Sequence, residues 1–322
     1  MDHPPTRAGR PHGRGGQAST VPITIPHEHS IPHDELAALE DRVRAALARG
    51  DSGGLDVLGY GEVSLVLRLR TDQGSYACKR LPVFPTRERF ERYSLLLAEY
   101  LRRLEESGVR AAATSLWHAP LPDGRLVGYC VQEALPAQRL CVNLLQEQDE
   151  AWAEAFCKRL LGTIEGAISP ALGLDAQLSN WADVDGQLVY LDVTTPLLRD
   201  QHGRERLDLR LFFSSLPWCL RDPVRLTMSG SIIDKYYQPR GAILDFLGNL
   251  HKEGLSRLVP GFLAQANAGL DHPITADEVT AYYRGDARMW ELLQRLRRAD
   301  RFWHRAVRRR TYPFLLPPAI ER

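Results

Sequence analysis

The sequence predicts an α+β protein with two parts, a small antiparallel sheet followed by a mostly helical region. Residues 58–69, 75–81 and 114–132 alternate apolar and polar side chains around glycine-containing turns, as half-buried strands do. One amphipathic helix, at about 87–107, separates these strands, and from residue 147 onwards the apolar spacing is mostly helical. A chain of 322 residues is long enough for two lobes that share a cleft.

The composition is that of an ordinary globular protein, with 44% hydrophobic and 25% charged residues. The net charge of +1 gives no reason to expect a nucleic-acid or membrane partner. The five cysteines form no Cys-x-x-Cys pair, and their number is odd, which indicates reduced residues of a cytoplasmic protein. No apolar run is long enough to span a bilayer, and the N-terminus lacks the apolar core of a signal peptide.

The chain divides into three segments by composition and periodicity. Residues 1–33 are rich in Pro, Gly, Arg and His, so we expect a disordered or loosely docked tail. Residues 34–135 hold a first helix, capped by Asp34 and stopped at Gly50, and then the strands of the first lobe. Residues 136–322 form the helical second lobe. The last predicted helix is rich in arginine, which favours either a solvated face over an apolar stripe or a surface for an acidic partner.

A loop and hairpin near the middle of the chain bring three oxygen-bearing side chains together. Asp175 and Asn180 stand five residues apart, and Asp192 ends a short apolar strand after the turn at 183–186. Such a set can place a general base and hold a hard cation through oxygen ligands.

A second group of candidate residues lies in the first lobe. Gly59-x-Gly61-x-x-Ser64 falls between two strands, where small residues let backbone N–H groups approach a polyphosphate. Lys79 follows on the next strand among apolar residues, and a lysine there needs a partner. The expected partner is Glu99 in the following helix, with Glu91 as the rival.

These stretches together resemble the protein-kinase-like phosphotransferases, most closely the aminoglycoside-phosphotransferase branch and uncharacterised kinase-like proteins of actinobacteria. Residues 58–66 match the Gly-rich loop, 77–79 the Ala-x-Lys strand, and 175–180 the spacing from the catalytic Asp to an Asn. Residues 191–193 stand where the family carries Asp-Phe-Gly, and order and separation agree from about 55 to 195.

The resemblance implies a bilobal protein-kinase-like fold and a phosphotransferase that uses ATP and magnesium. Its acceptor would be a hydroxyl of a small molecule or peptide. Asp175 would be the catalytic base and Lys79 would hold the phosphates, while Asn180 and Asp192 would bind magnesium. The implied nucleotide contacts are Gly59, Gly61, Ser64, Lys79, Glu99 and the backbone of the interlobe link Gln132, Glu133 and Ala134.

Three departures from the family pattern favour an alternative. Leu174 replaces a basic residue before the catalytic Asp, Gln177 replaces a Lys or His after it, and Val193-Thr194 replaces Phe-Gly. The alternative is a weak or inactive kinase-like protein, a pseudokinase that binds nucleotide or acts as a scaffold.

Overall fold

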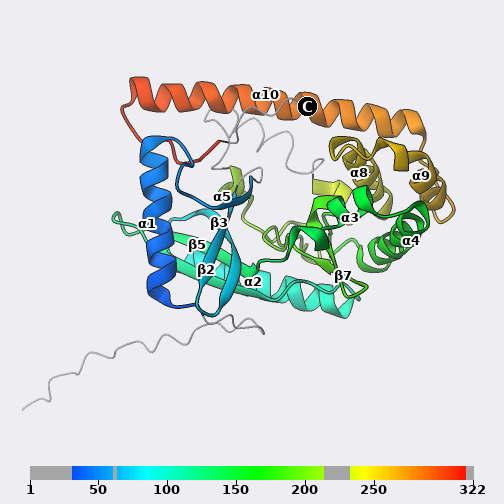
Figure 1. The fold of residues 1–322 in the computed structure, drawn as a ribbon, viewed down its shortest axis with the longest axis horizontal. Helices are drawn as coiled ribbons and strands as arrows, with labels where there is room; N and C mark the ends of the chain where they lie inside the picture. Colours follow the sequence, from blue (N-terminus) through cyan, green and yellow to red (C-terminus); the bar gives the residue numbers. More distant parts are fainter. Residues whose placement is uncertain (1–30, 61–63, 214–232, 317–322) are drawn as a thin grey trace, which may run out of the picture.

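The computed structural model describes residues 31–60, 64–213 and 233–316 (Figure 1). The predicted N-terminal tail up to residue 30 and the predicted phosphate contact Gly61 lie outside these residues. The predicted fold class is confirmed, because a five-stranded antiparallel sheet near the N-terminus is followed by a mostly helical region.

The sheet has the strand order β1-β2-β3-β5-β4, and every neighbouring pair is antiparallel. A helix covers each face: apolar residues of α1 (His33–Arg49) pack on one side, and those of α2 (Arg87–Glu106) pack on the other. The strands are β1 (Val57–Tyr60), β2 (Leu65–Thr71), β3 (Gly74–Phe84), β4 (Thr114–Pro120) and β5 (Leu126–Glu133).

Strand β3 carries different chemistry on its two faces. Cys78 is fully buried in the cluster with α1, and its neighbour Lys79 therefore points to the opposite face. Arg80, back on the α1 side, makes a bidentate ion pair with the buried Glu40 of α1, with both N–O distances at 2.9 Å. The hydroxyl of Tyr129 donates to the same carboxylate at 2.6 Å. This network holds α1 against one face of the sheet, and Lys79 extends from the opposite face.

The second region is built on buried apolar helices around a small hairpin. The hairpin β6–β7 turns at Asp185 and Gly186, which both have positive φ angles, as a two-residue type I′ turn requires. The main elements of the second region are α3 (Cys141–Glu147), α4 (Glu150–Ala167), β6 (Trp181–Val184), β7 (Gln187–Tyr190), α5 (Leu209–Phe213), α8 (Pro239–Lys252), α9 (Val259–Asn267) and α10 (Ala276–Phe302).

Helix α10 connects the two regions along one side of the molecule (Figure 1). It starts at a capping box formed by Thr275 and Glu278 and packs on α8. A short π-helical extension follows, from which Arg305 donates to the carbonyl oxygens of Ala48 and Arg49 at the end of α1. Gly50 has a φ of +84° and lies against this guanidinium. The C-terminal helix therefore spans from the helical region to the sheet region.

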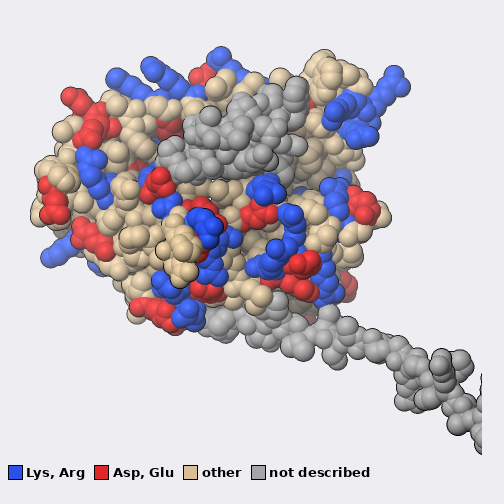
Figure 2. All heavy atoms as spheres, turned by 180° about the vertical axis from the view of Figure 1, so that it is seen from behind, with Lys and Arg blue, Asp and Glu red and all other residues tan. Residues whose placement is uncertain are grey.

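Positive and negative side chains are interspersed over the described part of the face in Figure 2, as the near-zero net charge leads one to expect. Within the described residues, no helix combines the length and apolarity needed to cross a membrane.

Candidate functional site

Lys79 and Asp192, predicted to belong to one site, meet in the structure. The Lys79 ammonium donates to Oδ1 of Asp192 at 2.7 Å, although the two residues are 113 positions apart in the sequence. Both side chains are largely shielded from solvent, with exposed fractions of 19% and 30%. The sheet thus supplies the cation and the segment after the β6–β7 hairpin supplies the anion.

The Asp192 carboxylate is held through one of its two oxygens. Besides Lys79, the backbone N–H and the hydroxyl of Thr194 both donate to Oδ1, at 3.3 and 2.8 Å. Burial raises the pKa of Asp192, but the ammonium and the Thr194 donors outweigh it, so this pKa lies below its usual range. Asp192 is therefore ionised at neutral pH, and its Oδ2 is the oxygen left to meet a ligand.

Asn180 and Asp175 are joined to this pair through the backbone. The Asn180 side-chain N–H donates to the carbonyl oxygen of Asp175 at 3.2 Å, and the backbone carbonyl of Asn180 accepts from Leu191 at 2.8 Å. The amide nitrogen of Asn180 is thus used for orientation, and its Oδ1 is available as a ligand. The predicted spacing of Asp175, Asn180 and Asp192 therefore corresponds to one connected unit.

Asp175 has a strongly perturbed carboxyl group. Burial and the nearby carboxylates of Asp245 and Asp192 raise its pKa to about 7, against the opposing effects of the Lys235 ammonium and the Gln177 backbone N–H. The Gln177 N–H donates to Asp175 at 3.2 Å. A carboxyl with a pKa near neutrality can both accept and release a proton at physiological pH.

Sequence reasoning missed a second Lys–Asp pair beside Asp175. Lys235 donates to the buried carboxylate of Asp245 at 2.8 Å and to the hydroxyl of Tyr282 at 2.6 Å. The Gln177 side chain reaches Asp245 at 3.4 Å. Burial lowers the pKa of Lys235, but the interactions with Asp245 and Tyr282 raise it by more. The net pKa is therefore above its ordinary value, and the ammonium stays charged.

One signal in the sequence pointed to Lys235. Only four of the 41 basic Lys and Arg residues are lysines, at positions 79, 158, 235 and 252. Lysine is a compact charge, whereas arginine presents a rigid fork, so a chain that uses arginine almost everywhere has reason to keep lysine where a point charge is needed. Two of the four lysines are the ones at this site.

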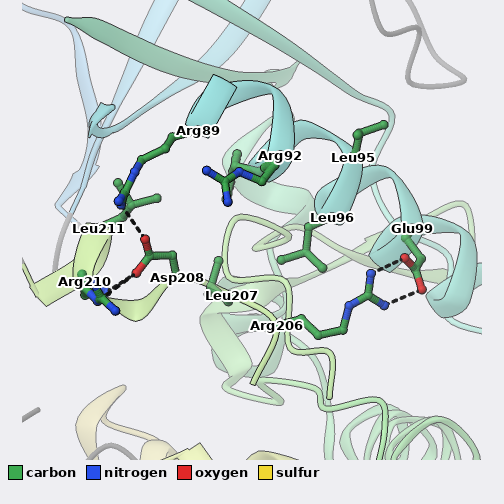
Figure 3. A pocket seen from close by; sticks show the side chains of 11 residues that line it. Arg89, Arg92, Leu95, Leu96, Glu99, Arg206, Leu207, Asp208, Arg210 and Leu211 are labelled. Atoms are coloured by element: carbon green, nitrogen blue, oxygen red, sulfur yellow. Dashed lines mark hydrogen bonds and ion pairs between the residues drawn. The ribbon is translucent and has the colours of Figure 1, made fainter. Parts of the chain in front are cut away.

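The predicted pairing of Lys79 with Glu99 is wrong. Glu99 makes a bidentate ion pair with Arg206, with both N–O distances at 2.7 Å, at the edge of a pocket on the outer side of α2 (Figure 3). The rival Glu91 pairs with Arg87 one turn away on the surface. Helix α2 turns its apolar and tyrosine face to the core, so both carboxylates face outwards.

Two tyrosines of α2 contact the site instead. The buried Tyr93 hydroxyl donates to the carbonyl oxygen of Thr194 at 2.8 Å. Seven residues later on the same face, Tyr100 donates to the carbonyl oxygen of Gly173 at 3.1 Å. The helix therefore braces the backbone just after Asp192 and just before Asp175. Sequence reasoning did not single out these tyrosines, because i, i+7 spacing is also that of an ordinary buried stripe.

The expected nucleotide contacts of the interlobe link are partly occupied by the protein itself. The Ala134 N–H donates to the carbonyl oxygen of Ser75 at 2.9 Å, so it is not free for an adenine ring. The Gln132 side chain donates to the carbonyl oxygen of Leu191 at 2.9 Å and so helps to position Asp192. Glu133 ends β5 opposite Tyr76.

The glycine segment lies at the end of the sheet. Gly59 sits in β1 opposite Val66, and a Cβ added to it would meet no atom of the described residues within 4 Å. Ser64 immediately precedes β2. Open space above Gly59 is what a backbone that approaches a ligand requires.

The donor set fits magnesium better than a transition metal. Within the described residues, no group of three or more His, Cys, Asp or Glu side chains is arranged to hold a metal. One carboxylate and one amide oxygen, completed by phosphate oxygens and water, is a typical way to hold Mg²⁺. Asp192 and Asn180 would be its protein ligands.

Comparison with solved structures gives weak likenesses. WaaP in complex with acyl carrier protein is 16% identical at a TM-score of 0.32, covering 68% of this chain and 89% of WaaP. A mutant form of the Mycobacterium tuberculosis PknI kinase domain is 13% identical at a TM-score of 0.30, covering 73% of this chain and 96% of that domain. These TM-scores are too low to define fold or function, and no curated protein matches the sequence. A family profile, however, matches residues 38–301, from α1 through α10, and the chain therefore belongs to the family of unknown function DUF6206.

Proposed function

We propose that this protein is a kinase-like phosphotransferase that uses ATP and magnesium. The observation that carries the proposal is the ion pair of Lys79 with Asp192, which the Leu191 N–H joins to the backbone of Asn180. The hydrogen bonds of these two side chains with the described residues use Oδ1 of Asp192 and the amide nitrogen of Asn180, which leaves Oδ2 and Oδ1, respectively, as candidate ligands. A cation and two hard oxygen donors are what binding of a metal–polyphosphate needs.

The residues at the site would have different roles in the reaction. Lys79 would hold the phosphates, and the tyrosines of α2 keep the two backbone segments of the site at a constant separation. Asp175, with its pKa near 7, would orient the acceptor hydroxyl and take its proton. Bound Mg²⁺ would supply charge neutralisation at the phosphates.

The acceptor would be a hydroxyl of a small molecule or peptide, and the resemblance to the aminoglycoside-phosphotransferase branch favours a small molecule. Dependence on ATP would place the protein in the cytoplasm. The four described cysteines are buried and free, which fits a reducing compartment.

A kinase-like protein that binds nucleotide without transferring phosphate is the second candidate. The occupied Ala134 amide and the fully buried Leu174 before Asp175 favour it.

Isothermal titration calorimetry with ATP tests the binding step. We expect binding in the presence of Mg²⁺ and a loss of at least about tenfold in Asp192→Asn, because a charged ligand is removed. Asp123→Asn, in an exposed turn where Asp123 pairs with Arg125, is the matched control and should bind as the wild type does. Mg²⁺-independent or absent binding in the wild type contradicts the proposal.

Turnover separates the two candidates. A phosphotransferase should release ADP from ATP, at least slowly with water as acceptor, and Asp175→Asn should abolish this release while ATP still binds. If the wild type and the variant both bind ATP and neither releases ADP, the second candidate, a protein that binds nucleotide without transferring phosphate, is correct.

A further inference from the structure

A pocket of about 510 Å³ opens on the outer side of α2, away from the residues of the proposed reaction (Figure 3). It lies between α2 and the segment from Arg206 to Leu211. Four arginines line it, and we call it the arginine pocket: Arg89, Arg92, Arg206 and Arg210.

The arginine pocket carries a surplus of positive charge. The described residues that line it include two carboxylates, Glu99 and Asp208, against four arginines, and Asp208 is shared by Arg89 and Arg210. Glu99 holds Arg206 at one end, and Asp208 accepts from one terminal nitrogen of Arg89 at 2.8 Å at the other. Figure 3 shows Arg92 between these two pairs.

The place of the arginines on α2 adds to this field. The helix begins at Arg87, so Arg89 and Arg92 lie in its first two turns. The N-terminus of a helix is positive, which disfavours cations there and favours an anion. The outer partner of Arg92 is Glu88, at 3.3 Å, and both side chains are mostly exposed. Such exposed pairs contribute little, and an anion in the pocket would compensate the field better.

The arginine pocket also has an apolar wall. Leu95, Leu96, Leu207 and Leu211 line it; the last three are already buried, whereas Leu95 is 58% exposed. A free inorganic ion would leave this surface wet. A ligand with an apolar group next to its anionic head would cover it.

We propose that the arginine pocket binds a phosphomonoester that carries an apolar group. Its phosphate lies between Arg92 and Arg206, and its apolar group lies against the exposed Leu95 at the rim. A phosphate complements the excess of arginines over carboxylates in the lining, and guanidinium groups bind phosphate oxygens in a bidentate manner. This site is distinct from the Lys79 site, but Tyr93 lines the pocket and also bonds the backbone next to Asp192.

Calorimetric titration with phenyl phosphate, at constant ionic strength and without nucleotide, tests the proposal. We expect phenyl phosphate to bind saturably. Inorganic phosphate should bind more weakly, because it lacks the apolar group, and phenol should not bind. Arg92→Gln and Arg206→Gln should each raise the Kd about tenfold, since each removes a charged hydrogen-bond donor. Glu99→Gln should lower the Kd, because it frees Arg206 from its competing carboxylate.

Two controls make the outcome decisive. Arg102 lies on the same helix but pairs with Glu106 outside the pocket, so Arg102→Gln should leave the Kd within about twofold. Lys79→Met should also leave it unchanged, because the phosphate of this ligand does not lie at Lys79. Loss of binding in either control, or no effect of Arg92→Gln, overturns the proposal. So does an absence of saturable binding up to about 10 mM.

Discussion

Replacing Asp175 by Asn should stabilise the free protein at alkaline pH and much less at acid pH. The carboxyl has a folded-state pKa of about 7 against an ordinary value of 3.8. Because its pKa is raised, the folded protein favours the protonated form. The stability that comes from this form is present below pH 4 and is lost as the pH rises to 7. The amide of the Asp175→Asn variant carries no such charge at any of these pH values.

The magnitude follows from the size of the shift. A difference of about three pKa units corresponds to about 4 kcal/mol if the full shift is realised, at about 1.4 kcal/mol per unit. About 2.5 kcal/mol of this loss of stability occurs between pH 5 and pH 8. Asp175 is partly exposed, so solvent screening reduces the expected change to about 1–2 kcal/mol.

Urea unfolding at pH 5, 6, 7 and 8, with EDTA to remove metals, measures the effect. The unfolding free energy of Asp175→Asn minus that of the wild type should increase by about 1–2 kcal/mol as the pH rises from 5 to 8. Asp123→Asn is the control: Arg125 lowers the pKa of Asp123, so its difference from wild type should stay constant above pH 5. A pH-independent difference for Asp175→Asn would refute the reasoning.

Three further substitutions probe the contacts that hold the site. Lys79→Met leaves Asp192 without its ammonium and should weaken Mg–ATP binding at least about tenfold in calorimetry, with Lys158→Met as an exposed control. Tyr93→Phe removes one buried hydrogen bond and should lower the free energy of unfolding by about 1 kcal/mol in urea. Gly50→Ala meets a positive φ and the Arg305 guanidinium, so limited proteolysis should release the C-terminal helix faster than in wild type.

Local patterns in the sequence were sufficient for the fold class and for most elements. The alternation of apolar residues indicated β2 to β5, and Gly50 marked the end of α1, whereas the predicted cap Asp34 lies inside the first turn of this helix, which begins at His33. The turn residues Asp185 and Gly186 indicated the hairpin that carries Asp192. These features depend on backbone conformation over a few residues, which neighbouring side chains largely decide.

The site could be predicted only in part. Lys79 and Asp192 were expected at one site because the resemblance to kinase-like phosphotransferases places both residues there, and they do meet. The choice of Glu99, with Glu91 as the rival, as the partner of Lys79 failed, because a helix with charges on several sides does not show which of them faces the sheet. Tyr93 decided that orientation by packing into the core.

The sequence by itself determined the chemistry available to this protein: a scarce lysine in a strand, an Asp–Asn spacing and an Asp at the end of a hairpin. Only the tertiary structure decided the partners, such as Lys235 with Asp245 beside Asp175, and the arginines that gather in one pocket. The physical reason is that periodicity assigns a side chain to a face of its own element. Which faces meet depends on the packing of elements far apart in the chain.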